Sequence, residues 1–279
     1  SGQMNSLFAS ICTFPVDYFP VGEVPKVGLG YEKNSLGYRG DDFAERADLN
    51  VLFLGDSWTQ GAGVTEEETF ARVACTKLAD HYNVSVNNWN MGHGGKGYDA
   101  IARMLLSALP VLKPDIVFVT FPVMDRREYF TIDNDVVDIG VGIIAQTNRG
   151  NLAATPIKKD IFKRWEGLIS PIDDAAKAIM SYKLIELLLN ENDTMWGYCS
   201  VDWEPSATQM QELMKFGLFD MKYYLGSKFE KLADQSPTDG HPDVASHHLQ
   251  GERIFNWLTS RYGKKLDEIC RDRSKDDEI

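Results

Sequence analysis

The chain has 279 residues, of which 43% are hydrophobic and 25% charged, and it carries a formal net charge of -12 at pH 7. This composition is that of a globular protein with a sizeable core, and one α/β domain can reach this length if it carries an insertion. The negative charge and the lack of a Lys/Arg-rich run argue against nucleic acid or anionic lipid as a partner, and no apolar run approaches the roughly 20 residues that span a membrane.

Residues 1–49 are predicted to form an irregular lead-in that ends in an edge-strand candidate, "NSLGYRGDDF". "SGQM" resembles a cloning remnant ahead of a natural start at Met4, and the stretch that follows lacks the features of a signal peptide. We expect a cytoplasmic location if Met4 is the native start, whereas a secreted protein trimmed of its leader would overturn that expectation. The cysteines are scattered without a CxxC pair, which favours free thiols; they are Cys12, Cys75, Cys199 and Cys270.

Strands and helices are predicted to alternate from residue 50 onward. "NVLFLG" (50–55), "VSVNNWN" (84–90) and "PDIVFVTF" (114–121) have the character of strands, and the stretches at 66–82 and 98–112 have helical spacing of their apolar residues. This alternation predicts an α/β fold with a parallel sheet and right-handed crossovers. Ligands of such sheets bind beyond the carboxyl ends of the strands, so we expect the loops at 55–63, 91–97 and 121–127 to converge there.

Residues 131–235 are predicted to be a mainly helical insertion or lid. Within them, 173–192 has the pattern of a helix, 195–203 of a strand, and 206–233 of one or two further helices. The end of the chain is predicted to be a loop at "DGHP", then a helix beginning near Pro242, then a solvated tail, "RDRSKDDEI". No linker divides the chain, so residues 1–279 are expected to form a single domain.

Ser57 follows the first of these buried strands and is a candidate nucleophile. A serine hydroxyl needs a base to take its proton, and the base needs an acid to orient it. Of the histidines, His241 is the best placed, since it precedes a helix and follows Asp239 by two residues; the others are His81, His93, His247 and His248. The alternatives are that Ser57 is a helix cap or turn residue and that "DGHP" is a turn capping the last helix.

Three stretches together resemble the SGNH, or GDSL-type, esterases and acylhydrolases. They are "GDS" at 55–57, the glycine loop "MGHGGKG" at 91–97, and "DGHP" at 239–242, and the resemblance spans roughly residues 35–260. It implies a flavodoxin-like parallel sheet with helices on both faces, the SGNH hydrolase fold. It also implies a triad of Ser57, Asp239 and His241, and an oxyanion hole formed by the amides of Ser57 and Gly95, the latter five residues after Asn90.

The chain departs from the family pattern in two places. Met124 stands where the family has an oxyanion-hole asparagine, and a thioether cannot donate a hydrogen bond. Arg126 and Arg127 are the nearest candidates to replace that donor, and with Asn90 they are possible substrate or oxyanion contacts. A solvated surface cluster is the simpler interpretation of Arg126, Arg127 and Glu128. The second departure is the interval of two residues between the acid and the histidine, where the family commonly has three.

The leading function is therefore a serine esterase that cleaves a small acyl ester, possibly an O-acetyl group on a carbohydrate, through an acyl-enzyme. An O-acyltransferase of the same fold and a catalytically weak binding or assembly protein stay open as alternatives. No cofactor or metal is expected. The glycine loop also fits the spacing of a dinucleotide site, but no acidic residue closes the following strand, and the His and Asp residues of "DGHPD" lack a typical metal-ligand spacing.

Overall fold

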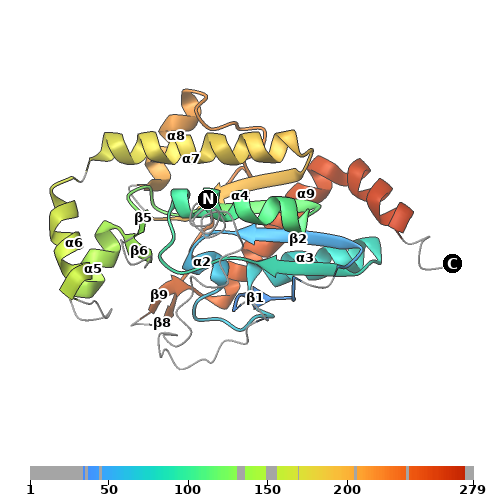
Figure 1. The fold of residues 1–279 in the computed structure, drawn as a ribbon. Coiled ribbons are helices and arrows are strands. Elements are labelled where there is room, and N and C mark those ends of the chain that lie inside the picture. Colours follow the sequence, from blue (N-terminus) through green and yellow to red (C-terminus); the bar gives the residue numbers. More distant parts are fainter. Residues whose placement is uncertain are drawn as a thin grey trace, which may run out of the picture.

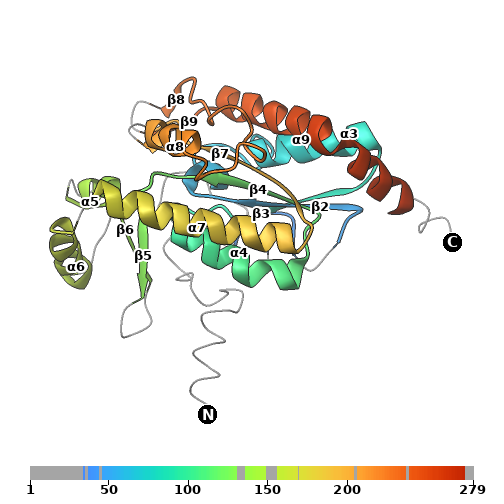
Figure 2. The ribbon, with the colours of Figure 1, turned by 90° about the horizontal axis from the view of Figure 1, so that it is seen from above.

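A five-stranded sheet lies between two layers of helices in the computed structural model (Figures 1 and 2). The structure describes residues 34, 37–43, 46–130, 136–148, 156–168, 170–203, 206–236 and 239–273. Most of the predicted lead-in, with Met4 and Cys12, lies outside the described residues. The described cysteines, Cys75, Cys199 and Cys270, are buried free thiols, as expected.

The central sheet has the strand order β1-β3-β2-β4-β7. Its strands are β1 (Arg39–Gly40), β3 (Val86–Asn90), β2 (Leu49–Leu54), β4 (Ile116–Phe121) and β7 (Met195–Ser200). The last four are parallel to one another and β1 pairs antiparallel with β3. The chain moves outward in one direction from β2 to β3 and then crosses to β4 on the other side, which is the flavodoxin-like arrangement. The predicted fold class is confirmed, and the ligand-binding crevice of such a sheet lies between the carboxyl ends of β2 and β4.

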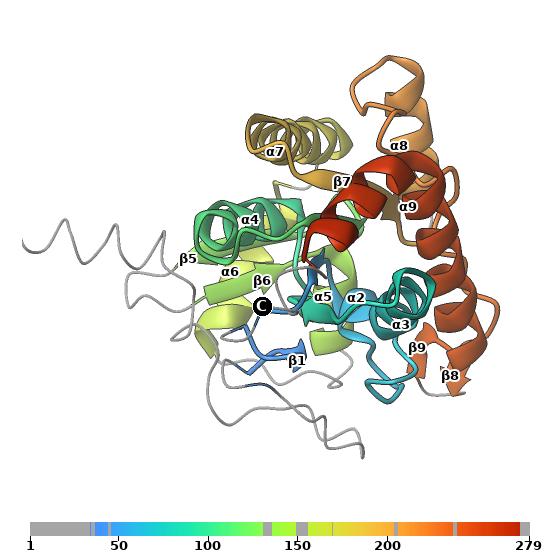
Figure 3. The ribbon, with the colours of Figure 1, turned by 90° about the vertical axis from the view of Figure 1, so that its right-hand side faces the viewer.

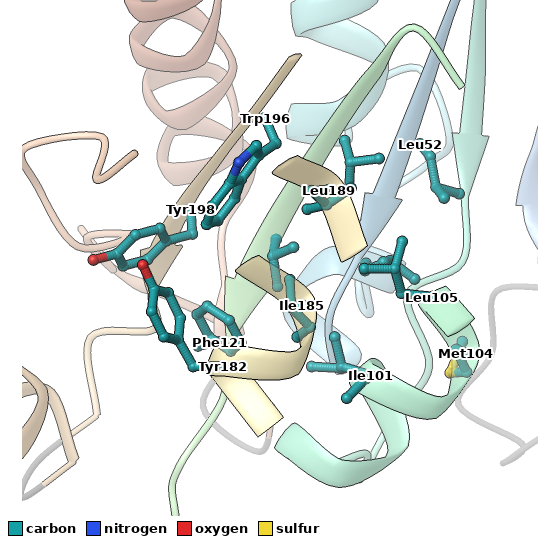
Figure 4. Packing of buried hydrophobic residues seen from close by; sticks show 14 of the residues in the cluster. Leu52, Ile101, Met104, Leu105, Phe121, Tyr182, Ile185, Leu189, Trp196 and Tyr198 are labelled. Atoms are coloured by element: carbon teal, nitrogen blue, oxygen red, sulfur yellow. The ribbon is translucent and has the colours of Figure 1, made fainter. Parts of the chain in front are cut away.

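Helices cover both faces of the sheet (Figure 3). On one face α3 (Phe70–Tyr82) packs against α9 (Val244–Arg273), and on the other α4 (Tyr98–Leu112) packs against α7 (Pro171–Glu191). All residues of β2, β4 and β7 are buried because both of their faces are covered. Figure 4 shows the core between α4, α7 and the sheet, where Phe121, Tyr182 and Tyr198 gather beside aliphatic residues of both helices.

The segment predicted as an insertion, 131–235, contains two elements of the sandwich itself, α7 and β7. The part outside the layers is shorter: a hairpin of β5 (Arg127–Phe130) and β6 (Val136–Ile139), followed by α5 (Val141–Asn148) and α6 (Pro156–Glu166). These elements have a small core of their own, formed by Val137, Ile139, Ile144, Phe162 and Trp165.

The stretch 206–233 forms one helix, α8 (Ser206–Lys215), and not two. Gly217 and Gly226 have φ of +69° and +90°, which takes the chain out of helical conformation. Between and beyond them the backbone pairs with β7: the Leu225 amide donates to the Tyr198 carbonyl at 2.8 Å and the Phe229 amide to the Ser200 carbonyl at 2.7 Å. Leu225 and Phe229 are therefore buried along the edge of the sheet without belonging to a helix.

The last helix, α9, begins at Val244 and extends further than predicted, through Arg273. Pro242 belongs instead to β9 (Asp239–Pro242), which pairs antiparallel with β8 (Asp234–Ser236). The arginines of the predicted tail are helical because Arg273 pairs with Asp115 at the amino end of β4, at 2.7 Å. Residues 274–279 lie outside the described part of the chain.

His247 links α9 to the start of α3 inside the core. Its Nδ1 accepts a hydrogen bond from the Phe70 amide at 3.2 Å, and its ring stacks on that of Phe70. Burial lowers the pKa of His247 to about 3, so the folded protein holds the neutral imidazole. An unfolded histidine has a pKa near 6.5.

The free energy of unfolding should therefore depend on pH through His247. The contribution of the neutral ring is complete above a pH of about 6.5 and is lost as the pH falls toward 3, by at most about 1.4 kcal/mol per pH unit. We expect His247→Asn, which keeps an acceptor for the Phe70 amide, to give a shallower loss of stability between pH 6.5 and 4.5 in urea unfolding. Parallel curves for the two proteins would contradict this assignment.

Candidate active site

Ser57 is the first residue of α2 (Ser57–Gln60), a single helical turn that follows β2 at the carboxyl edge of the sheet. Asp56 caps this turn: its Oδ1 accepts a hydrogen bond from the Trp58 amide at 3.0 Å. Ser57 is half-buried, and among the described residues neither its hydroxyl nor its amide has a hydrogen-bond partner. The cap fixes the direction of the turn and leaves these two groups of Ser57 available.

Arg39 closes the other end of the α2 turn, a role that no sequence motif indicated. Its guanidinium is buried and donates to three carbonyl groups, those of Gln60 at 3.0 Å, Gly61 at 2.6 Å and Val64 at 2.9 Å. Carbonyl groups at a helix end otherwise lack partners. Arg39 thus ties the edge strand β1 to the segment that carries Ser57.

The glycine loop lies beside Ser57, as the family resemblance implied. A Cβ placed on Gly94 would lie 3.7 Å from Ser57 Cβ. The loop is bonded to the serine segment twice, since the His93 amide donates to the Gly55 carbonyl at 3.1 Å and the Gly94 amide to Gln60 Oε1 at 3.2 Å. The glycine next to the serine side chain is therefore Gly94, for which the sequence predicted no role beside Ser57.

Gly95 makes the turn of this loop, with φ of +83°. A Cβ on Gly95 would contact Ile143 at 3.6 Å and Asp138 at 3.9 Å, so the hairpin and α5 cover this residue. In the part of the chain that the structure describes, the Gly95 amide has no hydrogen-bond partner. It is available as an oxyanion donor, the role that the resemblance implied for it.

Asn90 links β3 to α2. It is buried, its Nδ2 donates to the Thr59 carbonyl at 2.8 Å, and its Oδ1 accepts from the Gly92 amide at 2.9 Å. The prediction of a substrate or oxyanion contact does not fit these bonds. Asn90 instead holds the glycine loop against the serine segment, because both ends of its amide group are bonded to those two segments.

The residues after β4 separate into two roles. Met124 is buried in the core, so it does not stand in an open oxyanion hole. Arg127 is buried as well and faces α7, where its Nη2 pairs with Asp174 Oδ1 at 2.8 Å, which removes it as a candidate donor near Ser57. Arg126 points the other way: its Nη1 pairs with Asp56 Oδ2 at 2.6 Å.

The interpretation of Arg126, Arg127 and Glu128 as a solvated surface cluster is wrong. The exposed fraction of the side chain is 14% for Arg126, 5% for Arg127 and 3% for Glu128. Buried charges require partners, and each of these has one. A run of four charged residues at 125–128, separated by three residues from the end of a buried strand, was the only sequence signal for this arrangement.

His241 lies in β9, and β9 contacts α2 (Figure 1). The fold thus brings the "DGHP" stretch next to the turn that begins with Ser57, although 184 positions separate the two residues. His241 is half-buried. The stretch is a short strand and not the predicted loop.

No group of three or more His, Cys, Asp or Glu residues in the described chain could hold a metal ion. Asp243, which could have joined His241 in such a group, caps α9: its Oδ1 accepts from the amide and the hydroxyl of Ser246. None of the helices described is long and apolar enough to cross a membrane.

No family model and no curated protein sequence matches the chain. Among solved structures, a protein from Desulfitobacterium hafniense described as lipolytic and of the G-D-S-L family shares 13% identity over 75% of this chain and 99% of its own, with a TM-score of 0.42. The lipase Lip_vut3 from a goat rumen metagenome shares 15% identity over 75% of this chain and 97% of its own, with a TM-score of 0.46.

A third match, a carbohydrate esterase family 2 enzyme with a carbohydrate-binding domain from Corynascus thermopiles, shares 12% identity over 77% of this chain and 67% of its own, with a TM-score of 0.45. Members of the family that the sequence resembles are thus among the matched structures. Since the TM-scores lie below 0.5, we infer function from this chain's own residues.

The two neighbouring arginines make a matched test of this geometry. Arg126→Met should leave the Asp56 carboxylate buried and unpaired and Arg127→Met should do the same to Asp174, each at a cost of about 3–5 kcal/mol in the free energy of unfolding. Hydrogen exchange should then rise in different places: in residues 55–64 for Arg126→Met, and at the start of α7 for Arg127→Met. Equal exchange in residues 55–64 of both variants would contradict the separate roles.

Proposed function

We propose that this protein is a serine esterase or acylhydrolase in which Ser57 is the nucleophile and His241 the general base. The observation that carries the proposal is the contact of α2 with β9, which brings together the segments of these two residues. The glycine loop borders Ser57 as well. A nucleophile, a base and backbone donors at one edge of a sheet are the parts that acyl transfer requires.

The reaction would proceed in two steps. Ser57 Oγ attacks the carbonyl carbon of the ester while His241 takes the hydroxyl proton, and the tetrahedral intermediate collapses to an acyl-enzyme as His241 returns the proton to the leaving alcohol. Water, deprotonated by His241, then attacks the acyl group and releases the acid. Asp239 would orient the imidazole and stabilise its charged form.

The negative oxygen of the intermediate would be held by the amides of Ser57 and Gly95. Each preorganised donor of this kind contributes about 2.7–4 kcal/mol to lowering a barrier. Arg126 is the remaining candidate for the donor that the family places at position 124, because it reaches Asp56, the residue before Ser57. Its Nη1 holds that carboxylate while its other N–H groups have no partner among the described residues.

For the substrate we propose an ester of a small acyl group, such as an O-acetyl group on a carbohydrate or a similar alcohol, on the strength of the resemblance to SGNH esterases. Transfer of the acyl group to a sugar hydroxyl, in place of water, would use the same acyl-enzyme. The ratio of free acid to transferred product would distinguish the two outcomes.

A fluorophosphonate probe tests the nucleophile. The intact protein should be labelled stoichiometrically and Ser57→Ala should not be labelled, because the probe bonds only to an activated hydroxyl. Ser85→Ala is the matched control: Ser85 is exposed and immediately precedes β3, at the opposite edge of the sheet, so labelling should be unchanged. An intact protein without label, or a labelled Ser57→Ala, would refute the proposal.

A panel of p-nitrophenyl esters tests the base and the acyl group. We expect hydrolysis of acetate over butyrate over longer chains. His241→Asn should lower kcat by about 100- to 10,000-fold because the serine loses its proton acceptor. His248→Asn, which changes an exposed histidine of α9, should have wild-type activity; equal activity of the two variants would exclude His241 as the base.

A further inference from the structure

The glycine loop beside Ser57 is held from two sides. On the side of the serine, the Gly94 amide donates to Gln60 Oε1 at 3.2 Å. On the other side, Lys96 reaches out of the loop toward the β5–β6 hairpin and is itself buried, with 7% of its surface exposed. Gly95, the proposed oxyanion donor, lies between these two attachments.

Lys96 is bonded to both strands of the hairpin. Its Nζ lies 3.1 Å from Glu128 Oε1 in β5 and 3.1 Å from each carboxylate oxygen of Asp138 in β6. Arg103 of α4 pairs with Glu128 through two further bonds, of 2.6 and 2.8 Å. Two cations and two anions thus form an ion-pair cluster between the glycine loop, α4 and the hairpin.

The cluster pairs two positive with two negative side chains that are largely buried. These ion pairs hold the side chains in fixed orientations as well as at short distances. The Glu128 side chain is 3% exposed and that of Lys96 9%. Burial alone would lower the pKa of Lys96, but Asp138 and Glu128 raise it above its ordinary value, so the ammonium stays charged. The three bonded oxygens hold the buried ammonium in place, because its departure would remove its ion pair with Asp138 and would leave Glu128 paired with Arg103 alone.

We propose that Lys96 is a positioning residue of this site: through Glu128 and Asp138 it fixes the glycine loop, and with it the Gly95 amide, in the geometry that stabilises the oxyanion. The inference rests on the proposed function, because it assigns to Gly95, an oxyanion donor of that reaction, a support by Glu128 and Asp138, which lie outside the stretches that resemble the family. It also gives the hairpin a role, since the hairpin supplies both carboxylates and its Asp138 borders Gly95 directly.

The test compares Lys96→Met with Arg273→Met in the full-length protein. Arg273→Met removes an ion pair at the amino end of β4, far from Ser57 in the sheet, and serves as the control for a general loss of stability. For p-nitrophenyl acetate, Lys96→Met should lower kcat by about 10- to 100-fold with KM within about two-fold, because a displaced donor weakens transition-state binding alone. Arg273→Met should keep the wild-type kcat at a temperature where both are folded.

Hydrogen exchange of residues 91–97 gives a second measurement that needs no activity. Lys96→Met should exchange faster in this loop than the wild type, and Arg273→Met should not. If Lys96→Met does not fold, Lys96→Gln, which keeps one donor toward Asp138, replaces it and should show the same kcat loss and faster loop exchange.

The outcomes separate this inference from the proposed function. A wild-type protein that neither reacts with the fluorophosphonate nor hydrolyses esters refutes the function, and the exchange measurement then decides whether Lys96 anchors the loop. An active wild type with unchanged kcat and loop exchange in Lys96→Met overturns the positioning role alone. Equal kcat losses in Lys96→Met and Arg273→Met overturn it too, since general instability would explain both.

Discussion

The Asp56 carboxylate makes the two interactions on which the candidate site depends. It is 1% exposed and performs two tasks: one oxygen caps the turn that carries Ser57, and the other pairs with Arg126 from the segment after β4. A buried carboxylate without such partners would be strongly destabilising. The pairing therefore forces the loops after β2 and β4 together, at the point between the two strands where a doubly wound sheet leaves a crevice.

The rest of the site is built outward from that pair by polar groups that face inward. Asn90 and Gln60 attach the glycine loop to the serine segment, and Arg39 closes the far end of the turn. Lys96 connects the same loop to a hairpin outside the helical layers. The segment around Ser57 is thereby held by side chains of three other segments, those of Arg39, Asn90 and Arg126, which is what preorganised donors at a reacting centre require.

The sequence alone predicted those parts of the fold that follow from the local pattern of apolar residues. Buried parallel strands appear as continuous apolar runs, so β2 and β4 were predicted within two residues of their bounds, and α4 was predicted at Tyr98–Leu112. The resemblance implied that Ser57 and His241 lie close together, and the elements that contain them, α2 and β9, are in contact. The strand character of "DGHP" could not be predicted, because it arises from pairing with β8. Neither of these two strands has the continuous apolar run that identifies a buried strand.

What could not be predicted depends on non-local partners: Arg126 and Arg127 are adjacent in sequence but bind carboxylates 70 positions before and 47 positions after them. The claim that Ser57 and His241 act together is tested most directly by a crystal structure of the fluorophosphonate adduct. The account predicts phosphorus bonded to Ser57 Oγ, its free oxygen within about 3.1 Å of the Ser57 and Gly95 amides, and a His241 ring nitrogen within about 3.2 Å of Ser57 Oγ. An adduct on another residue, or an imidazole directed away from Ser57, would contradict it.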